Sequence, residues 1–337
     1  MREHRVPNLR VRTFAHPDVL EEQSSGRRHR GSVRHWLAAA VVVALLAAIA
    51  IHAYRAREEL ANIQRLSLGM LMGTCVLQFV SQMLLNGALL LPLRTCMKAL
   101  GFWELYVVRT GGLFVGGLVP VAGGLAVRLA YLRSRGLTYV DFMWATLFSN
   151  VLALGAAAVL AVGATGLLWM MAGPPAAPVL GVSAAVLAIS LAALAAFEFL
   201  PRLTRHPALR KWRWLSGMSS LKTNRRMAIR VSGLSLARQV VNFVTFGLLY
   251  QSLSRGPEDF LTGGLVYALT SPVRMVVITP GNLGVTEWFV ALVGKVLAFD
   301  LITGLIVAVA FRGVALVAQG LAALVGSAWL ALGNRPS

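Results

Sequence analysis

Long apolar runs separated by short polar stretches cover most of this chain. An α-helix of about 20 residues crosses the ~30 Å hydrocarbon core of a bilayer, and several runs are near or above that length. We therefore predict an all-α integral membrane protein with about six full transmembrane helices. The predicted spans are Trp36–Tyr54, Leu68–Leu93, Phe142–Met171, Val179–Leu200, Val231–Leu253 and Ile302–Leu332.

Two further apolar stretches, Tyr106–Leu132 and Leu261–Phe299, are interrupted near their middle by proline and glycine. Proline removes a helical hydrogen bond and glycine loosens the backbone, so neither stretch is expected to form one straight helix. Non-helical backbone at membrane depth is tolerated only inside protein or beside a wet cavity. We predict two re-entrant segments, whose breaks contain Pro120, Gly123 and Gly124, and Pro280, Gly281, Asn282 and Gly284.

Charge follows the same division of the chain. Only 13% of the residues are charged, about half the share in soluble domains, and the net charge is +19. The segment Pro201–Arg230 is rich in Arg and Lys and has no acidic residue. Cytoplasmic loops of membrane proteins are enriched in Lys and Arg, so this loop and both termini are predicted to face the cytoplasm. This bias accounts for the positive net charge. A nucleic-acid-binding role is not needed to explain it, and no nucleic-acid-binding motif is present.

Outside the spans, the sequence predicts little folded structure. Residues 1–35 are arginine-rich and poor in apolar side chains, which predicts a disordered cytoplasmic arm. Residues 36–332 then form a single membrane domain, which begins with a signal-anchor helix and not with a cleaved signal. Cys75 and Cys96 are too few for a disulfide framework and are assigned to packing. These features predict a multi-pass protein of the bacterial inner membrane.

The two halves of the membrane domain resemble each other. Basic flanks indicate that the first broken segment enters from the cytoplasm, and the same reasoning places the entry of the second on the outside. Paired broken segments in corresponding halves point to a transporter's midplane site. We predict an inverted repeat with halves 68–171 and 231–332. An offset of 160 residues pairs Pro120 with Pro280, Gly124 with Gly284, Gln78 with Arg238, and Gln82 with Asn242.

Polar side chains inside the apolar runs are the candidate functional residues. Gln78, Gln82 and Asn86 recur at four-residue spacing and share one helix face. Amides in membrane helices either hydrogen-bond to neighbouring helices or line a cavity, and both interpretations remain open. The full candidate set for substrate binding is Gln78, Gln82, Pro120, Gly123, Gly124, Arg128, Arg238, Asn242, Arg274, Pro280, Gly281, Asn282, Gly284, Glu287 and Arg312.

Ionisable groups at membrane depth are costly and mark function by default. We expect Arg109 and Arg128, near the ends of their segment, to extend toward the interface. Arg238, Arg274 and Arg312 are expected to line a cavity for an anionic headgroup, because guanidinium groups match phosphate oxygens. Glu287 would neutralise them or carry a coupling proton; the alternative is a buried structural ion pair.

Helices that restart after the two breaks would present backbone N–H groups to an anion. The sequence has no phosphate-loop, HExxH, GxSxG or paired-cysteine motif. It therefore predicts neither an enzyme nor a bound cofactor or metal.

At the two breaks the sequence resembles a flippase-like family that shares the transmembrane region of lysylphosphatidylglycerol synthases. The resemblance covers roughly Leu68 to Leu332. It implies no aminoacyl transfer, because the soluble synthase domain has no counterpart here. The matching motifs are Leu113-Phe114, Leu118-Val119-Pro120, Gly123-Gly124, Val127-Arg128 and Tyr131-Leu132 in the first segment, and Thr279-Pro280-Gly281-Asn282-Leu283-Gly284-Val285-Thr286-Glu287 in the second.

The sequence thus favours translocation or presentation of an anionic or isoprenoid-linked lipid across the inner membrane. The main alternative is a non-catalytic partner that docks a lipid- or glycan-modifying enzyme through Arg27–Arg34 and Pro201–Arg230. Intramembrane catalysis and transport of a small solute are weaker alternatives.

Overall fold

A computed structural model describes residues 67–118, 123–173, 177–203, 225–253, 259–275 and 284–333. Within these ranges the regular structure is entirely helical, as predicted. The predicted arm, the first predicted span and residues 204–224 of the basic loop lie outside the described residues. The helices are α3 (Leu68–Cys96), α4 (Phe102–Leu118), α5 (Gly123–Ser134), α6 (Tyr139–Ala172), α7 (Ala177–Leu203), α9 (Arg225–Leu253), α10 (Asp259–Met275), α11 (Val285–Val296) and α12 (Leu301–Gly333).

Local sequence sets several of these boundaries. The Ser67 hydroxyl accepts a hydrogen bond from the Met70 N–H at 3.2 Å and begins α3. Thr138 begins α6 in the same way, because its hydroxyl accepts from the Asp141 N–H. Gly173 ends α6 with φ of 85°, a conformation that glycine adopts without strain.

Four of the described helices, α3, α6, α7 and α12, are long and apolar enough to cross a bilayer. They coincide with four of the six predicted spans. The predicted span Val231–Leu253 lies in α9, which has the same 29-residue length as α3 but is less apolar. Its polar side chains, among them Gln239 and Asn242, are buried against other helices. The polar side chains of α9 therefore face other helices of the protein.

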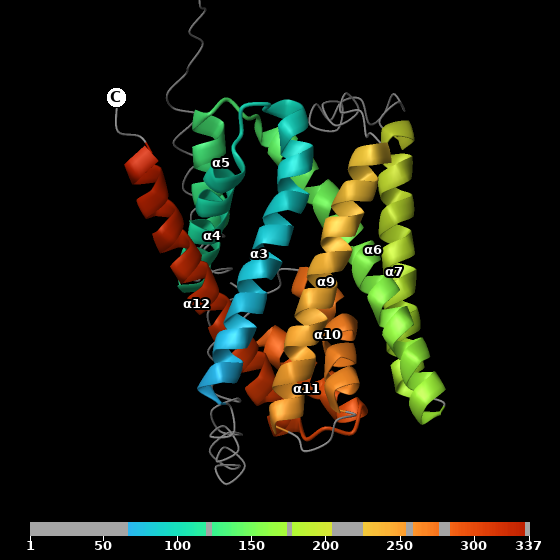
Figure 1. Ribbon diagram of the computed structural model, residues 1–337. Helices are drawn as coiled ribbons and strands as arrows, with labels where there is room; N and C mark the ends of the chain where they lie inside the picture. The colour runs from blue at the N-terminus through green and yellow to red at the C-terminus, as the bar shows by residue number, and fades with distance from the viewer. Residues whose placement is uncertain are drawn as a thin grey trace, which may run out of the picture.

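Neither proline- and glycine-broken stretch is one continuous helix. The first gives α4 and α5, which pack together, and the second gives α10 and α11, which also pack together. Seventeen residues of α4 or α10 span about 25 Å, too short to cross the hydrocarbon core. Figure 1 shows the α4–α5 pair entering the bundle from the top and the α10–α11 pair entering from the bottom. Pro120, Pro280, Gly281 and Asn282 lie outside the described residues.

The helix lengths recur along the chain. The first four described helices, α3 to α6, have 29, 17, 12 and 34 residues. The helices α9 to α12 have 29, 17, 12 and 33 residues. The 27-residue α7 lies between the two groups. In Figure 1, α3 and α9 run side by side through the middle of the molecule.

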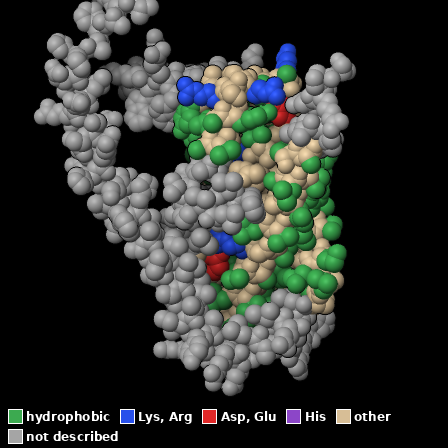
Figure 2. Space-filling model, turned by 90° about the vertical axis from the view of Figure 1, so that its left-hand side faces the viewer, with side chains coloured by type: hydrophobic (Ala, Val, Ile, Leu, Met, Phe, Trp, Pro, Cys, Tyr) green, Lys and Arg blue, Asp and Glu red, His purple; other side chains and the backbone are tan. Residues whose placement is uncertain are grey.

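The two ends of the bundle differ in charge. Figure 2 shows Lys and Arg side chains gathered at the top of the molecule, above a surface of mostly apolar side chains. The described basic residues at helix termini on that end include Arg94, Lys98, Arg133, Arg135, Arg225, Arg226 and Arg230. At the opposite end the described charged residues are Asp259, Lys295 and Asp300.

Glycine allows α9 and α10 to approach closely. A β-carbon on Gly247 would lie 2.6 Å from the backbone oxygen of Phe260, and one on Gly263 would lie 2.5 Å from the Tyr250 β-carbon. Small residues at such crossings are the usual basis of helix packing in membranes. The packing brings the aromatic side chains of α9 and α10 into one buried cluster.

We predict that Gly247→Val separates α9 from α10 and lowers the free energy of unfolding by about 1–3 kcal/mol, the usual range for overpacking. The measurement is thermal denaturation of the purified protein in detergent. Gly233→Val is the control on the same helix, because a β-carbon there meets nothing within 4 Å. Equal melting temperatures for the two variants would contradict the packing described here.

Candidate functional site

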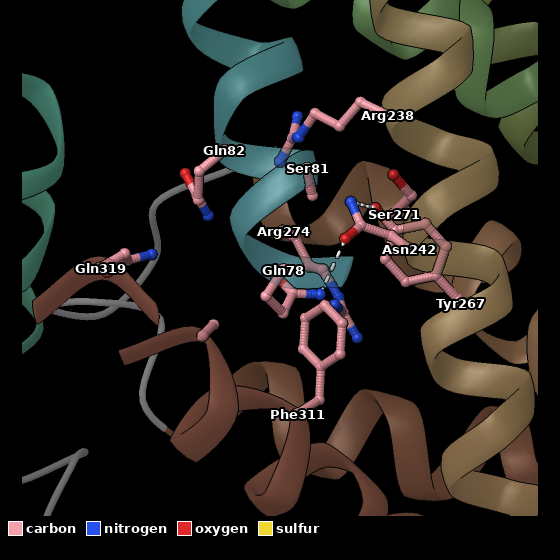
Figure 3. Close-up of a pocket in the computed structure, with 11 residues that line it drawn as sticks. Gln78, Ser81, Gln82, Arg238, Asn242, Tyr267, Ser271, Arg274, Phe311 and Gln319 are labelled. Carbon is pink, nitrogen blue, oxygen red and sulfur yellow. Dashed lines mark hydrogen bonds between the residues drawn. The ribbon is translucent and has the colours of Figure 1, made fainter. Parts of the chain in front are cut away.

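A cavity of about 220 Å³ lies where α3, α9, α10 and α12 meet (Figure 3). Gln78 and Gln82 are near the middle of α3, and Arg238 and Asn242 are near the middle of α9, so the cavity lies at mid-depth of the bundle. The lining residues are Gln78, Ser81, Gln82, Arg238, Asn242, Tyr267, Ser271, Arg274, Phe311, Ala315 and Gln319.

Five of the predicted residues, Gln78, Gln82, Arg238, Asn242 and Arg274, line this one cavity. They come from three helices that are far apart in the sequence. In Figure 3, Arg238 extends from α9 toward α3, while Arg274 lies beside Phe311.

A chain of hydrogen bonds forms one wall of the cavity. The Gln78 amide donates to Asn242 Oδ1 at 3.0 Å, and the Asn242 amide donates to the Tyr267 hydroxyl at 2.9 Å. Tyr267 donates to Gln239 Oε1 at 2.7 Å, and the Gln239 amide donates to the Ala153 carbonyl at 3.3 Å. Each donor is satisfied within the protein, so the wall is polar yet rigid.

The Arg274 guanidinium is surrounded by aromatic rings. Its Cζ lies 4.6 Å from the centroid of Phe246, 5.0 Å from that of Tyr267 and 5.0 Å from that of Phe311. Ring faces attract a cation through their quadrupole, by about 2 kcal/mol or more where water is excluded. The rings come from α9, α10 and α12, so they fix the position of this charge relative to three helices.

Arg109 does not extend to the interface, which corrects the sequence prediction. Only 2% of its surface is exposed, and it donates to the Gln82 backbone oxygen at 3.2 Å and to Gln82 Oε1 at 2.9 Å. The α4–α5 pair carries it inward to mid-depth, directly behind a cavity-lining side chain. Arg128, on α5, is partly exposed.

Glu287 pairs with Arg312, as expected for the lone acid among these arginines. Its other carboxylate oxygen accepts from the Gly284 N–H at 2.8 Å and so caps the start of α11. Gly284 has φ of 81°, which favours glycine at this turn. Arg312 therefore does not line the cavity, and the Gly284 N–H is already bonded.

The amide side chains of α3 differ in whether they line the cavity or only hydrogen-bond to neighbouring helices. Gln78 and Gln82 line the cavity while also bonding to other helices, whereas Asn86 is fully buried and donates to the Phe102 carbonyl at 3.0 Å. Gly123 and Gly124 begin α5. The part of the chain that the structure describes contains no group of three His, Cys, Asp or Glu side chains placed to hold a metal ion.

Several lining residues were missed by sequence reasoning. Tyr267 and Ser271 precede the predicted Arg274 on α10 by seven and three residues, which places all three on one helix face. That spacing was a usable signal. Phe311 and Ala315 carry no such signal, because apolar residues of α12 that face lipid look the same in sequence.

The family comparison covers most of the chain. A family model described as the lysylphosphatidylglycerol synthase TM region matches residues 36–323. No curated protein matches the chain. No solved structure matches it either.

We predict that Arg312→Gln lowers the free energy of unfolding by about 3 kcal/mol, because it leaves the buried Glu287 carboxylate without its partner. Arg135→Gln is the matched control, because it breaks the pair of the 58%-exposed Arg135 side chain with Glu104. That variant should melt close to the parent protein, since exposed ion pairs add little stability. Thermal denaturation in detergent compares them, and equal losses would contradict the burial of Glu287.

A second prediction concerns water in the cavity. In a protein with Cys75 and Cys96 replaced by alanine, Ala315→Cys should react with a small water-soluble thiol reagent roughly tenfold faster than Ala308→Cys, because thiol reactions require access. Both positions are on α12, but Ala308 belongs to the buried core. Mass spectrometry of the labelled protein measures the rates, and equal rates would mean that the cavity is closed to water.

Proposed function

Because this chain belongs to the family that shares the transmembrane region of lysylphosphatidylglycerol synthases, we propose that it translocates an anionic or isoprenoid-linked lipid across the bacterial inner membrane, without catalysing a reaction. Membership makes the chain a membrane protein linked to lipid metabolism or translocation. The lipid class, the direction and the membrane are the parts that we propose.

The mid-depth cavity is the observation that carries the proposal. A lipid headgroup that crosses a bilayer needs polar groups in place of water, whereas its tails stay in hydrocarbon. The cavity offers amide and hydroxyl groups together with two guanidinium groups, on helices whose outer surfaces are apolar. Guanidinium suits phosphate because it donates two parallel hydrogen bonds.

An inverted repeat would give the cavity alternating access. Its support is the matching lengths of α3 to α6 and α9 to α12, and the opposite entry of the two short helix pairs in Figure 1. Helix starts differ by 157 residues for α3–α9 and α4–α10, and by 162 for α5–α11 and α6–α12. The predicted offset of 160 falls between these values, because the second break is five residues longer than the first. Repeats of this kind open a central site to each side in turn.

Charge asymmetry supports the orientation. The basic end of the bundle, where α3 ends and α9 begins, would face the cytoplasm, as Lys- and Arg-rich ends do. The α4–α5 pair would then enter from the cytoplasm and the α10–α11 pair from outside. This agrees with the direction that the sequence predicts for each broken segment.

The proposal predicts lipid transfer in proteoliposomes that contain a fluorescent anionic lipid in both leaflets. A membrane-impermeant reductant should bleach the inner-leaflet label when the protein is present, and only the outer-leaflet label in protein-free vesicles. Arg274→Ala should slow transfer roughly tenfold or more, since a charged hydrogen-bonding group and its ring contacts are lost. Arg135→Ala, at the exposed helix end, is the control and should transfer at the parent rate.

If neither phosphatidic acid nor phosphatidylglycerol moves faster than in protein-free vesicles, translocation of anionic lipids is wrong. Dependence of a copurifying lipid-modifying enzyme on this chain, without transfer, would instead support a docking role.

A further inference from the structure

Positive charge exceeds negative charge around the cavity. Arg238 and Arg274 line it, Arg109 lies one side chain behind it, and Arg312 is bonded to Glu287. Glu287 is the only acidic side chain that the described ranges place at this depth, and residues 119–122 and 276–283 contain no Asp or Glu. The other described acids lie at or within two turns of helix ends: Glu104, Asp141, Glu198, Asp259 and Asp300.

Glu287 can offset only one of these positive charges. One of its oxygens accepts from Arg312 and the other from the Gly284 N–H, and only 5% of its surface is exposed. Both interactions tie the carboxylate to α11 and α12. Its single negative charge lies against Arg312 and also acts on Arg274, so within the described residues one acidic side chain at this depth faces four arginines, Arg109, Arg238, Arg274 and Arg312.

Within the described residues, neither Arg109 nor Arg238 forms an ion pair, and the two are close enough to repel each other. Arg109 donates to two oxygens of Gln82, and the buried Nε of Arg238 has no hydrogen-bond partner within the described part of the chain. A guanidinium carries five N–H donors and no acceptor. Removing such a group from water costs several kcal/mol unless an anion pairs with it. The arrangement is thus poised to take up negative charge.

We infer that the cavity is built for a headgroup that ends in a phosphate monoester or diphosphate, with two or more negative charges, and not for a singly charged phosphodiester. This inference rests on the proposed function and specifies its substrate class. A phosphate monoester carries about −1.5 to −2 charges near neutral pH. Two guanidinium groups at the cavity wall, with Arg109 behind Gln82, match that charge better than the single charge of a phosphodiester.

The size of the cavity also fits a terminal phosphate or diphosphate. The cavity volume of about 220 Å³ is several times the ~30 Å³ share of one water molecule, yet it is below the ~300–1,000 Å³ of pockets that enclose whole organic ligands. A terminal phosphate or diphosphate with a few waters fits such a space. The amides of Gln78 and Asn242 and the hydroxyl of Ser271 add polar groups around it.

The test compares two fluorescent lipids with identical acyl chains in the proteoliposome assay: phosphatidic acid, a monoester, and phosphatidylglycerol, a diester. Phosphatidic acid should transfer roughly tenfold faster, the effect of a single well-placed charge interaction. Sodium pyrophosphate should slow this transfer, whereas glycerophosphoglycerol at the same ionic strength should not. These measurements need only the unaltered protein.

Variants of Arg238 then test whether the preference for phosphatidic acid arises in the cavity. Arg238→Gln should bring the ratio of the two transfer rates close to one, and Arg238→Lys, which keeps the charge but loses the fork, should give an intermediate ratio. Arg135→Gln removes one positive charge at an exposed helix end and should keep the parent ratio.

Equal transfer of the two lipids by the unaltered protein would overturn this inference and leave the proposed function standing. A preference that persists in monodisperse Arg238→Gln protein would also overturn it. Failure of both lipids to move would instead contradict the proposed translocation of anionic lipids.

Discussion

A guanidinium group in the middle of a bilayer has to be solvated by the protein around it, and much of this structure follows from that requirement. Three aromatic rings surround Arg274, the two oxygens of Gln82 receive Arg109, and a carboxylate receives Arg312. Each of these three interactions joins a different pair or trio of helices. These charges therefore tie the helices around the cavity to one another.

The two broken segments make this arrangement possible. A helix that crossed the whole bilayer would carry Arg109 along a straight path, whereas the short α4 ends inside the bundle and brings this residue to Gln82 at mid-depth. On the other side, the start of α11 is held by Glu287, which also receives Arg312 from α12. Breaks in the helices thus exchange backbone hydrogen bonds for a polar interior that uninterrupted helices would not provide.

Much of the site could be predicted because a polar side chain in an apolar run has few places to go. Gln78, Gln82 and Arg238 were identified on that ground, and they meet in one cavity. Arg109 was assigned to the interface because its position was counted from the end of an apolar run, which ignores where a re-entrant helix turns. Phe311 could not be found, since an aromatic ring that faces a cation and one that faces lipid have the same sequence signature. The lengths of the two breaks could not be predicted either, because break length is not visible in apolar periodicity.

The role of α7 follows from how many times the chain passes through the bundle. A short helix pair that enters and leaves on one side contributes no net passage through the bundle, so α3, the α4–α5 pair and α6 together start and finish at the same end (Figure 1). A second group attached directly to α6 would begin at that end and have the same orientation as the first. The 27-residue α7 crosses the bundle once more, so the helices that follow it begin at the opposite end. In the proposed inverted repeat, loss or gain of a single such helix would convert antiparallel halves into parallel ones. A helix with little direct part in the cavity would thus decide how the two halves are oriented.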